Sequence, residues 1–112
     1  MSEAEPATYS AELQPERRRV PRIPFKAMSV VAERGSSRIV IAQTIDLSRF
    51  GCFVQAPEPY PRGTTVHIEM AEGGATFTAL GKVAYVTAEG MGIVFSMVEP
   101  DNQTILERWL AQ

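Results

Sequence analysis

Four arginines stand within six residues near the start of the chain, at Arg17, Arg18, Arg19 and Arg22. An arginine guanidinium is planar and permanently charged, and its fork of N–H donors matches both phosphate oxygens and the O6/N7 edge of guanine. Such a cluster favours binding of a small anion. A basic run of this kind is also typical of a solvated stretch or of a weak electrostatic tether, so the cluster alone does not decide between these roles.

A second group of polar residues follows further along, in the pattern Asp46-x-Ser48-x-x-Gly51. The carboxylate accepts hydrogen bonds, the hydroxyl donates or accepts, and a glycine allows another group to approach the backbone closely. The same pattern also occurs in ordinary turns, where Asp and Ser bond to nearby backbone and Gly supplies a positive φ. The combination of both groups favours a site for a planar anion that carries hydrogen-bond donors.

The charge is distributed unevenly along a chain whose net charge is −2. Residues 1–16 hold four glutamates and no base, whereas residues 17–26 hold five bases and no acid. Proteins that bind nucleic acid usually present a broad stripe of Lys and Arg. A single basic focus fits a small anion better than a polymer, so we expect no DNA partner.

Size and hydropathy place the chain among ordinary globular domains. It has 112 residues, of which 45% are apolar, and this length suits one domain. The apolar stretches are too short to span a bilayer and the N-terminus has no signal-peptide pattern, so we expect no membrane insertion and a cytoplasmic location. The single cysteine agrees with a reducing compartment.

The residues around the arginines are expected to lack regular structure. Residues 1–16 are poor in apolar side chains and are predicted to form a disordered tail. Residues 17–24 contain Pro21 and Pro24, which disfavour helix, and are predicted to form an extended switch arm ahead of the folded domain, which spans 17–112.

From Phe25 onward, short β-branched and aromatic runs alternate with turn residues and predict six strands. The predicted strands are 25–32, 37–46, 52–56, 65–71, 76–87 and 91–97. Short turns between them predict an antiparallel meander, and a small sheet of this size closes most economically as a barrel spanning 25–97. Residues 100–111 place Ile105, Leu106, Trp109 and Leu110 at helical spacing after Pro100 and predict one C-terminal helix packed on the barrel.

The residue types needed for catalysis are scarce. His67 lies in a predicted strand between inward-facing apolar neighbours and is expected to face solvent. Cys52 has no second group placed to activate it and is expected to be a small buried thiol. One Cys and one His cannot fill a tetrahedral zinc site. We therefore expect no enzyme activity, metal or cofactor.

With these motifs the sequence resembles the PilZ domain, a bacterial family that binds the second messenger cyclic di-GMP. The resemblance covers residues 17 to about 111. It rests on the motif RxxxR, here Arg18–Arg22, and on the motif [D/N]xSxxG, here Asp46–Gly51. The segment Gly90–Phe95 is similar to the final strand of the family. The resemblance implies a six-stranded antiparallel barrel with one helix.

The resemblance also implies roles for individual residues. Arg18 and Arg22 would clamp phosphate and guanine, and Asp46 would accept from the guanine N1–H and amino group. Ser48 would contact the ligand, and Gly51 would allow it to lie close to the backbone. Arg17, immediately before RxxxR, implies an intercalated dimer of cyclic di-GMP rather than one molecule.

The implied function is that of a stand-alone receptor in which the ligand orders the arm and alters contact with an effector protein. The family's usual settings are motility, surface polysaccharide with biofilm formation, and pilus assembly, and the sequence does not choose among them. Two alternatives stay open. One is a PilZ-like adaptor that does not bind the nucleotide, and the other is a small barrel that binds single-stranded nucleic acid.

Overall fold

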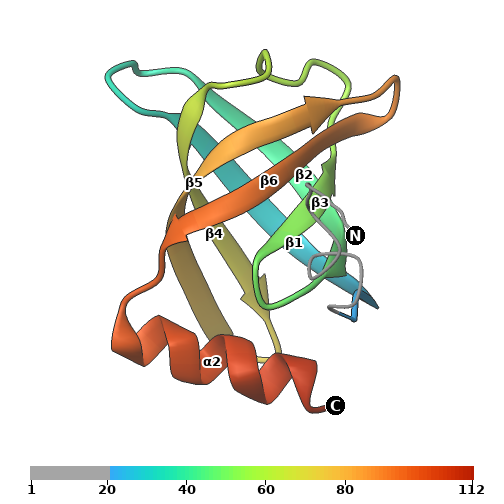
Figure 1. Ribbon diagram of the computed structural model, residues 1–112, viewed down its shortest axis with the longest axis vertical. Coiled ribbons are helices and arrows are strands. Elements are labelled where there is room, and N and C mark those ends of the chain that lie inside the picture. Colours follow the sequence, from blue (N-terminus) through green and yellow to red (C-terminus); the bar gives the residue numbers. More distant parts are fainter. Residues whose placement is uncertain (1–20) are drawn as a thin grey trace, which may run out of the picture.

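The computed structural model describes residues 21–112 as a closed antiparallel barrel with one helix at its foot (Figure 1). The six predicted strands and the helix are all present, and their bounds differ from the prediction by no more than two residues. The elements are β1 (Ile23–Glu33), β2 (Ile39–Leu47), β3 (Gly51–Gln55), β4 (Thr65–Glu72), β5 (Ala75–Val86), β6 (Gly90–Met97) and α2 (Pro100–Leu110).

The strand order around the barrel is β1-β2-β3-β6-β5-β4, so the predicted simple meander is wrong. β3 pairs with β6 because the connection between β3 and β4, residues 56–64, crosses the barrel end instead of forming a hairpin. Tyr60 of this connection is fully buried, and its hydroxyl lies 3.1 Å from the carbonyl oxygens of Val31 and Arg38. The connection of residues 56–64 therefore covers one end of the barrel and closes it with the side chain of Tyr60.

Alternating side chains fill the barrel interior. β1 buries Phe25, Ala27, Ser29 and Val31, whereas the residues between them are exposed or half-buried, which is the period expected of a strand with one face in a core. The buried hydroxyl of Ser29 in β1 is satisfied, because it lies 2.6 Å from the hydroxyl of Thr44.

Helix α2 covers the end of the barrel opposite to Tyr60. Its only two fully buried residues are Leu106 and Trp109. The Trp109 ring lies 4.9 Å from that of Phe25 and 6.1 Å from that of Phe77, measured between centroids. The predicted packing of the apolar stripe on the barrel is confirmed. Since Phe25 belongs to β1, the helix also holds the beginning of that strand in place.

The first strand begins at Ile23, two residues before the predicted start at Phe25. Ile23 pairs with Leu47 and packs against the core, and Pro24 pairs with Asp46. A register shift follows Pro24, and a proline is tolerated at such an irregularity because its missing N–H disrupts no regular ladder. The boundary between arm and barrel at 24/25 therefore needs correction, since Ile23 and Pro24 belong to the barrel.

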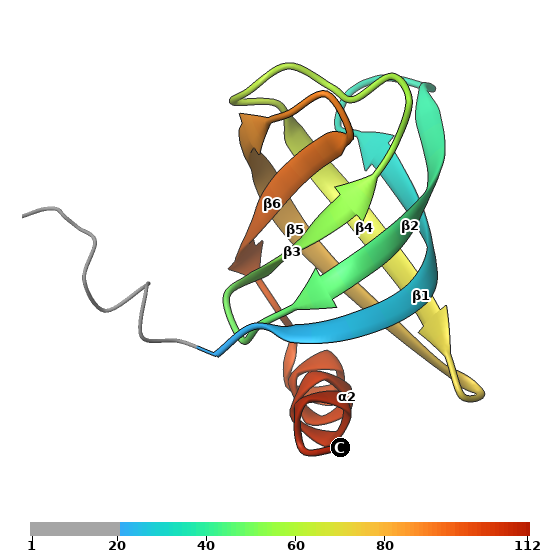
Figure 2. The ribbon, with the colours of Figure 1, turned by 90° about the vertical axis from the view of Figure 1, so that its right-hand side faces the viewer.

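Figure 2 views the wall of β6, β3 and β2 from outside, with the start of β1 running along its foot near α2. Pro21 and Ile23 line a hollow there together with Leu110. The chain therefore reaches the wall at Arg22, directly before Ile23, its first paired residue.

Within residues 21–112, no helix has the length and apolar character needed to cross a membrane.

Candidate functional site

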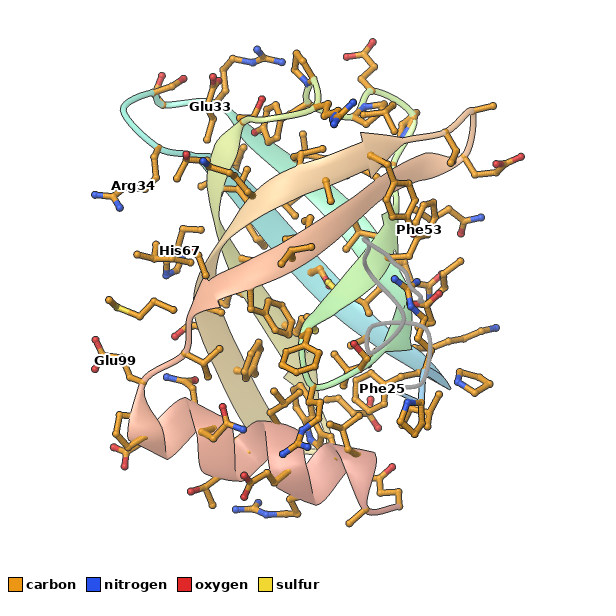
Figure 3. All side chains as sticks on the ribbon, viewed as in Figure 1. Phe25, Glu33, Arg34, Phe53, His67 and Glu99 are labelled. Carbon is orange, nitrogen blue, oxygen red and sulfur yellow. The ribbon has the colours of Figure 1, made fainter. Side chains whose placement is uncertain are left out.

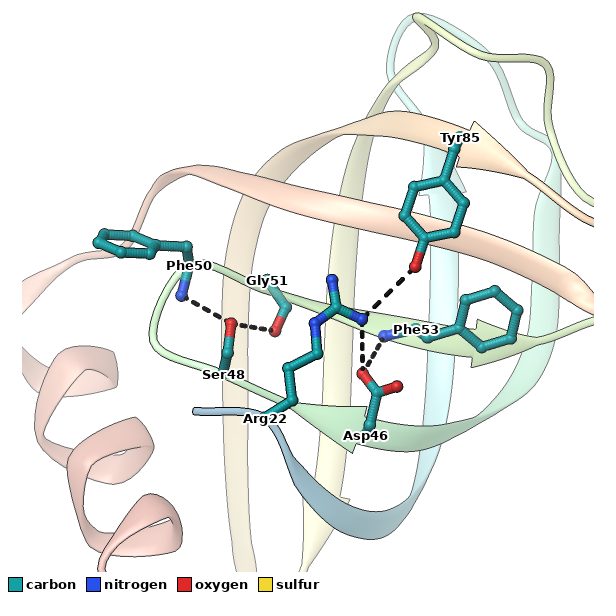
Figure 4. A network of polar contacts seen from close by, with 7 residues as sticks. All are labelled: Arg22, Asp46, Ser48, Phe50, Gly51, Phe53 and Tyr85. Carbon is teal, nitrogen blue, oxygen red and sulfur yellow. Dashed lines mark hydrogen bonds and ion pairs between the residues drawn. The ribbon is translucent and has the colours of Figure 1, made fainter. Parts of the chain in front are cut away.

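Arg22 and Asp46 meet on the outer face of this wall (Figure 4). One guanidinium nitrogen of Arg22, Nη1, lies 3.4 Å from Asp46 Oδ1 and 3.4 Å from the hydroxyl oxygen of Tyr85. Pro24 pairs with Asp46, and Arg22 stands two residues before Pro24 in the chain, so this pairing holds Arg22 close to Asp46. One arginine of the first motif and the acid of the second are therefore neighbours in the fold.

The carboxylate of Asp46 is held from two sides. Its Oδ1 accepts the backbone N–H of Phe53 in the adjacent strand β3 at 3.2 Å, in addition to the contact with Arg22. A register shift between Thr44 and Asp46 lies at this point of β2. The side chain of Asp46 remains 30% exposed. It is oriented by the backbone and still accessible to a ligand that donates hydrogen bonds.

The charge on Arg22 is stabilised where it stands. The hydrogen bond with Tyr85 raises the pKa of the guanidinium, the negative charge of Asp46 adds to this effect, and partial burial opposes it. Half of the side chain, 49%, stays exposed. Arg22 therefore presents a permanent positive charge to solvent, beside an oriented carboxylate.

Ser48 shapes the loop between β2 and β3 rather than projecting from it. Its hydroxyl accepts the N–H of Phe50 at 3.2 Å and lies 3.4 Å from the carbonyl oxygen of Gly51. The residue is only 6% exposed. The hydroxyl is thus used to hold the turn.

Gly51 is required for packing between strands. It is not among the glycines with positive φ, so that interpretation of the motif is wrong. A Cβ at this position would overlap the backbone carbonyl of Ile93 in β6. The glycine allows β3 and β6 to approach each other, which builds the wall on which Asp46 lies.

Tyr85 was missed from the sequence, although it contacts Arg22. Four outward positions form a row across the wall, because Asp46 pairs with Phe53, Phe53 with Gly92, and Gly92 with Tyr85. We call these residues the Asp46 row. The rings of Phe53 and Tyr85 stack with centroids 6.1 Å apart and an interplanar angle of 23°. The Asp46 row therefore brings together the carboxylate of Asp46, the hydroxyl of Tyr85 that contacts Arg22, and the stacked rings of Phe53 and Tyr85.

Gly92 makes room for this arrangement, because a Cβ there would overlap the ring of Tyr85. The available signal in the sequence was the pattern Gly90-x-Gly92 facing a strand that contains Tyr85. Since the pairing of β5 with β6 includes register shifts, spacing alone did not place Tyr85 opposite Gly92.

Arg17, Arg18 and Arg19, with the proposed tail 1–16, fall outside the described residues. Arg49 is exposed.

The two side chains considered for catalysis take no part in the site. His67 is exposed, and Figure 3 shows it on the opposite side of the barrel from Phe53. Cys52 is buried, and burial raises the pKa of its thiol, so the thiol stays protonated at neutral pH. Across residues 21–112, no three side chains of the metal-binding types cluster together.

Comparison with known proteins agrees with this fold. One solved structure that matches is described as the crystal structure of the PilZ domain of CeSA from a cellulose-synthesizing bacterium. The likeness has a TM-score of 0.65 with 22% sequence identity, and covers 79% of this chain and 92% of that chain, which establishes a shared fold. A search among curated proteins gave no match. The PilZ domain family matches residues 16–112, and since this is most of the sequence, the chain belongs to the PilZ domain family.

Proposed function

We propose that this protein is a cyclic di-GMP receptor that binds the ligand on the outer wall of its barrel. PilZ domains are generally cyclic di-GMP receptors and act as binding or adaptor domains. The observation that carries the proposal is the meeting of Arg22, Asp46 and Tyr85 at one place. This set offers the three interactions that a guanine nucleotide needs, namely a cation, a hydrogen-bond acceptor and an aromatic face.

Each group has a matching partner on the ligand. The guanine O6 and N7 atoms accept from the guanidinium of Arg22, in the fork geometry that one arginine satisfies. The guanine N1–H and amino group donate to Asp46. The half-exposed ring of Tyr85, 38% accessible, offers a surface on which a purine stacks. Binding exchanges the ion pair of Arg22 and Asp46 for contacts with the ligand, at small cost because exposed ion pairs contribute about 0–1 kcal/mol.

The signalling step follows from the position of Arg22. Arg22 lies directly before β1, so a ligand that contacts Arg22 is also close along the chain to the residues that precede it. In our proposal Arg17 and Arg18 close over the phosphates and Arg17 recruits a second, intercalated ligand molecule. Ordering of the segment 17–22 then changes a contact with an effector protein in the cytoplasm. Gly51 and Ser48 support the loop beneath the ligand.

The proposal is tested by calorimetric titration with cyclic di-GMP, GTP, linear di-GMP and a single-stranded oligonucleotide. We expect selective binding of cyclic di-GMP, with about two ligand molecules per chain. Tight binding of any oligonucleotide with a steep dependence on salt would instead support the nucleic-acid alternative. Absence of binding to every nucleotide would support the adaptor alternative, and a ratio near one would remove the role given to Arg17.

The contribution of Tyr85 is tested with Gly92→Ala, which adds a Cβ where the ring now lies. The ring is displaced and its hydroxyl leaves Arg22, while the ion pair of Arg22 with Asp46 is kept, so we expect binding to weaken by about tenfold, the effect of losing one stacked base. Tyr85→Ala should give a similar loss. Tyr85→Phe is the matched control, because it keeps the ring and should stay within about threefold of the parent in the same titration. If Gly92→Ala and Tyr85→Ala bind cyclic di-GMP as tightly as Tyr85→Phe does, a stacking role for the ring of Tyr85 is excluded.

A further inference from the structure

A second row of residues crosses the same wall beside the Asp46 row. The N–H of Ser48 donates to the carbonyl oxygen of Gly51 at 2.8 Å, Gly51 pairs with Val94, and Val94 pairs with Lys82. We call this set the Ser48 row. The two rows begin at Asp46 and Ser48 of one motif and end in β5, at Tyr85 and Lys82. In β3 and β6 the two rows are two residues apart, about 7 Å along the strand, and in β5 a register shift between Val83 and Tyr85 separates them by three residues.

The side chain of Lys82 has the length to reach the middle of the wall. Tyr85, also in β5, lies over Gly92 of β6 and places its hydroxyl 3.4 Å from Arg22. An extended lysine is about as long as a tyrosine, and its ammonium group is a mobile cation on a flexible stem. Between Lys82 and the loop stand only half-buried Val94 and Gly51, which has no side chain. Nothing bulky separates Lys82 from the surface beside the Asp46 row.

A cation on the β5 side would add to the positive charge that Arg17 and Arg18 would supply in the proposed complex. Cyclic di-GMP carries two phosphodiester charges, and the positive charge of Arg22 is already balanced by Asp46 in the described part of the protein. Lys82 is exposed, and among residues 21–112 no acidic side chain forms an ion pair with it. Arg22 precedes β1 and contacts Asp46 of β2, whereas Lys82 lies in β5, on the other side of the wall.

We propose that Lys82 is a further ligand-binding residue, which contacts a phosphate of the bound dinucleotide from the β5 side of the wall. This inference rests on the proposed function. The ligand then lies across the wall between two cationic groups, one from the chain before β1 and one from β5. Tyr85 and Lys82 act as neighbouring contacts, for base and phosphate respectively.

The test compares Lys82→Gln and Lys82→Arg with the parent in titrations with cyclic di-GMP at low and high salt. We expect Lys82→Gln to bind about tenfold more weakly at low salt, with a smaller difference at high salt, because a solvent-accessible charge contact is screened. Lys82→Arg should restore most of the affinity. Arg34→Gln removes the same charge in the β1–β2 turn, far from Phe53 in Figure 3, and should bind within about twofold of the parent.

Thermal unfolding of the variants separates a ligand contact from a structural role. Since Lys82 is exposed, Lys82→Gln should leave Tm within a few degrees of the parent. Parent-like affinity of Lys82→Gln, or equal losses in Lys82→Gln and Arg34→Gln, would overturn the Lys82 assignment and leave the receptor function standing. If the parent itself does not bind cyclic di-GMP, both the function and this inference fall.

Discussion

Replacement of Arg22 by alanine is expected to weaken cyclic di-GMP binding by about 10- to 100-fold. A hydrogen bond to a charged group contributes about 1.5–3 kcal/mol, which corresponds to this range of affinity. The loss should be large because Arg22 is the one arginine of the RxxxR motif that the described structure places at Asp46, with Nη1 3.4 Å from Oδ1. Calorimetric titration of the variant and the parent measures the change directly.

Two controls show whether this effect belongs to the site. Arg22 is half exposed and its ion pair lies at the surface, so Arg22→Ala should change the free energy of unfolding by no more than about 1 kcal/mol. Arg34→Ala removes an exposed arginine from the β1–β2 turn and should leave affinity unchanged. Parent-like binding by Arg22→Ala would show that the ligand does not use this arginine, and the proposed site on the wall would then be abandoned.

Replacement of Trp109 by alanine is expected to destabilise the fold by about 3–5 kcal/mol, the usual cost of removing a buried large aromatic side chain. Trp109 is 3% exposed and contacts the rings of Phe25 and Phe77. In a domain of this size such a loss lowers Tm by at least about 10 °C. Denaturant unfolding, followed by circular dichroism because the variant lacks the only tryptophan, measures the difference.

Glu107→Ala provides the matched control on the same helix, because Glu107 is exposed and its replacement should cost less than about 0.5 kcal/mol. Trp109→Phe should give an intermediate loss, since it retains part of the ring packing. Because Trp109 packs on Phe25 of β1, we also expect Trp109→Ala to loosen the start of that strand and weaken ligand binding. Unchanged stability in Trp109→Ala would contradict the packing of α2 on the barrel.

Much of the fold was predictable because it depends on local patterns. Strand β1 alternates buried and exposed residues with a period of two, and α2 begins at Pro100 and carries its apolar residues at helical spacing. The exposed state of His67 followed from the same alternation in β4, whereas the buried state of Cys52 was expected because no group is placed to activate its thiol. Boundaries and strand order needed correction. At Ile23, Pro21 and Pro24 predicted an extended arm, and the structure has the start of β1.

The candidate site was predictable only in part, for a related reason. Two motifs suggested that arginine and aspartate would act together, and Arg22 and Asp46 do lie in contact. The motif did not reveal that the hydroxyl of Ser48 is used within its own loop, or that Gly51 is needed for the approach of β6. These roles depend on the neighbours that each residue meets across strands.

The sequence by itself determined the elements, the inward and outward faces of each strand, and the concentration of positive charge before β1, because these follow from the order of residues along the chain. Only the tertiary structure decided that β3 lies beside β6 and β6 beside β5. That order brings Tyr85 to Arg22 and places Lys82 in line with the Ser48 loop. The physical reason is that strand pairing joins residues far apart in sequence. Its register depends on bulges and on a crossing connection whose buried tyrosine, Tyr60, closes the barrel.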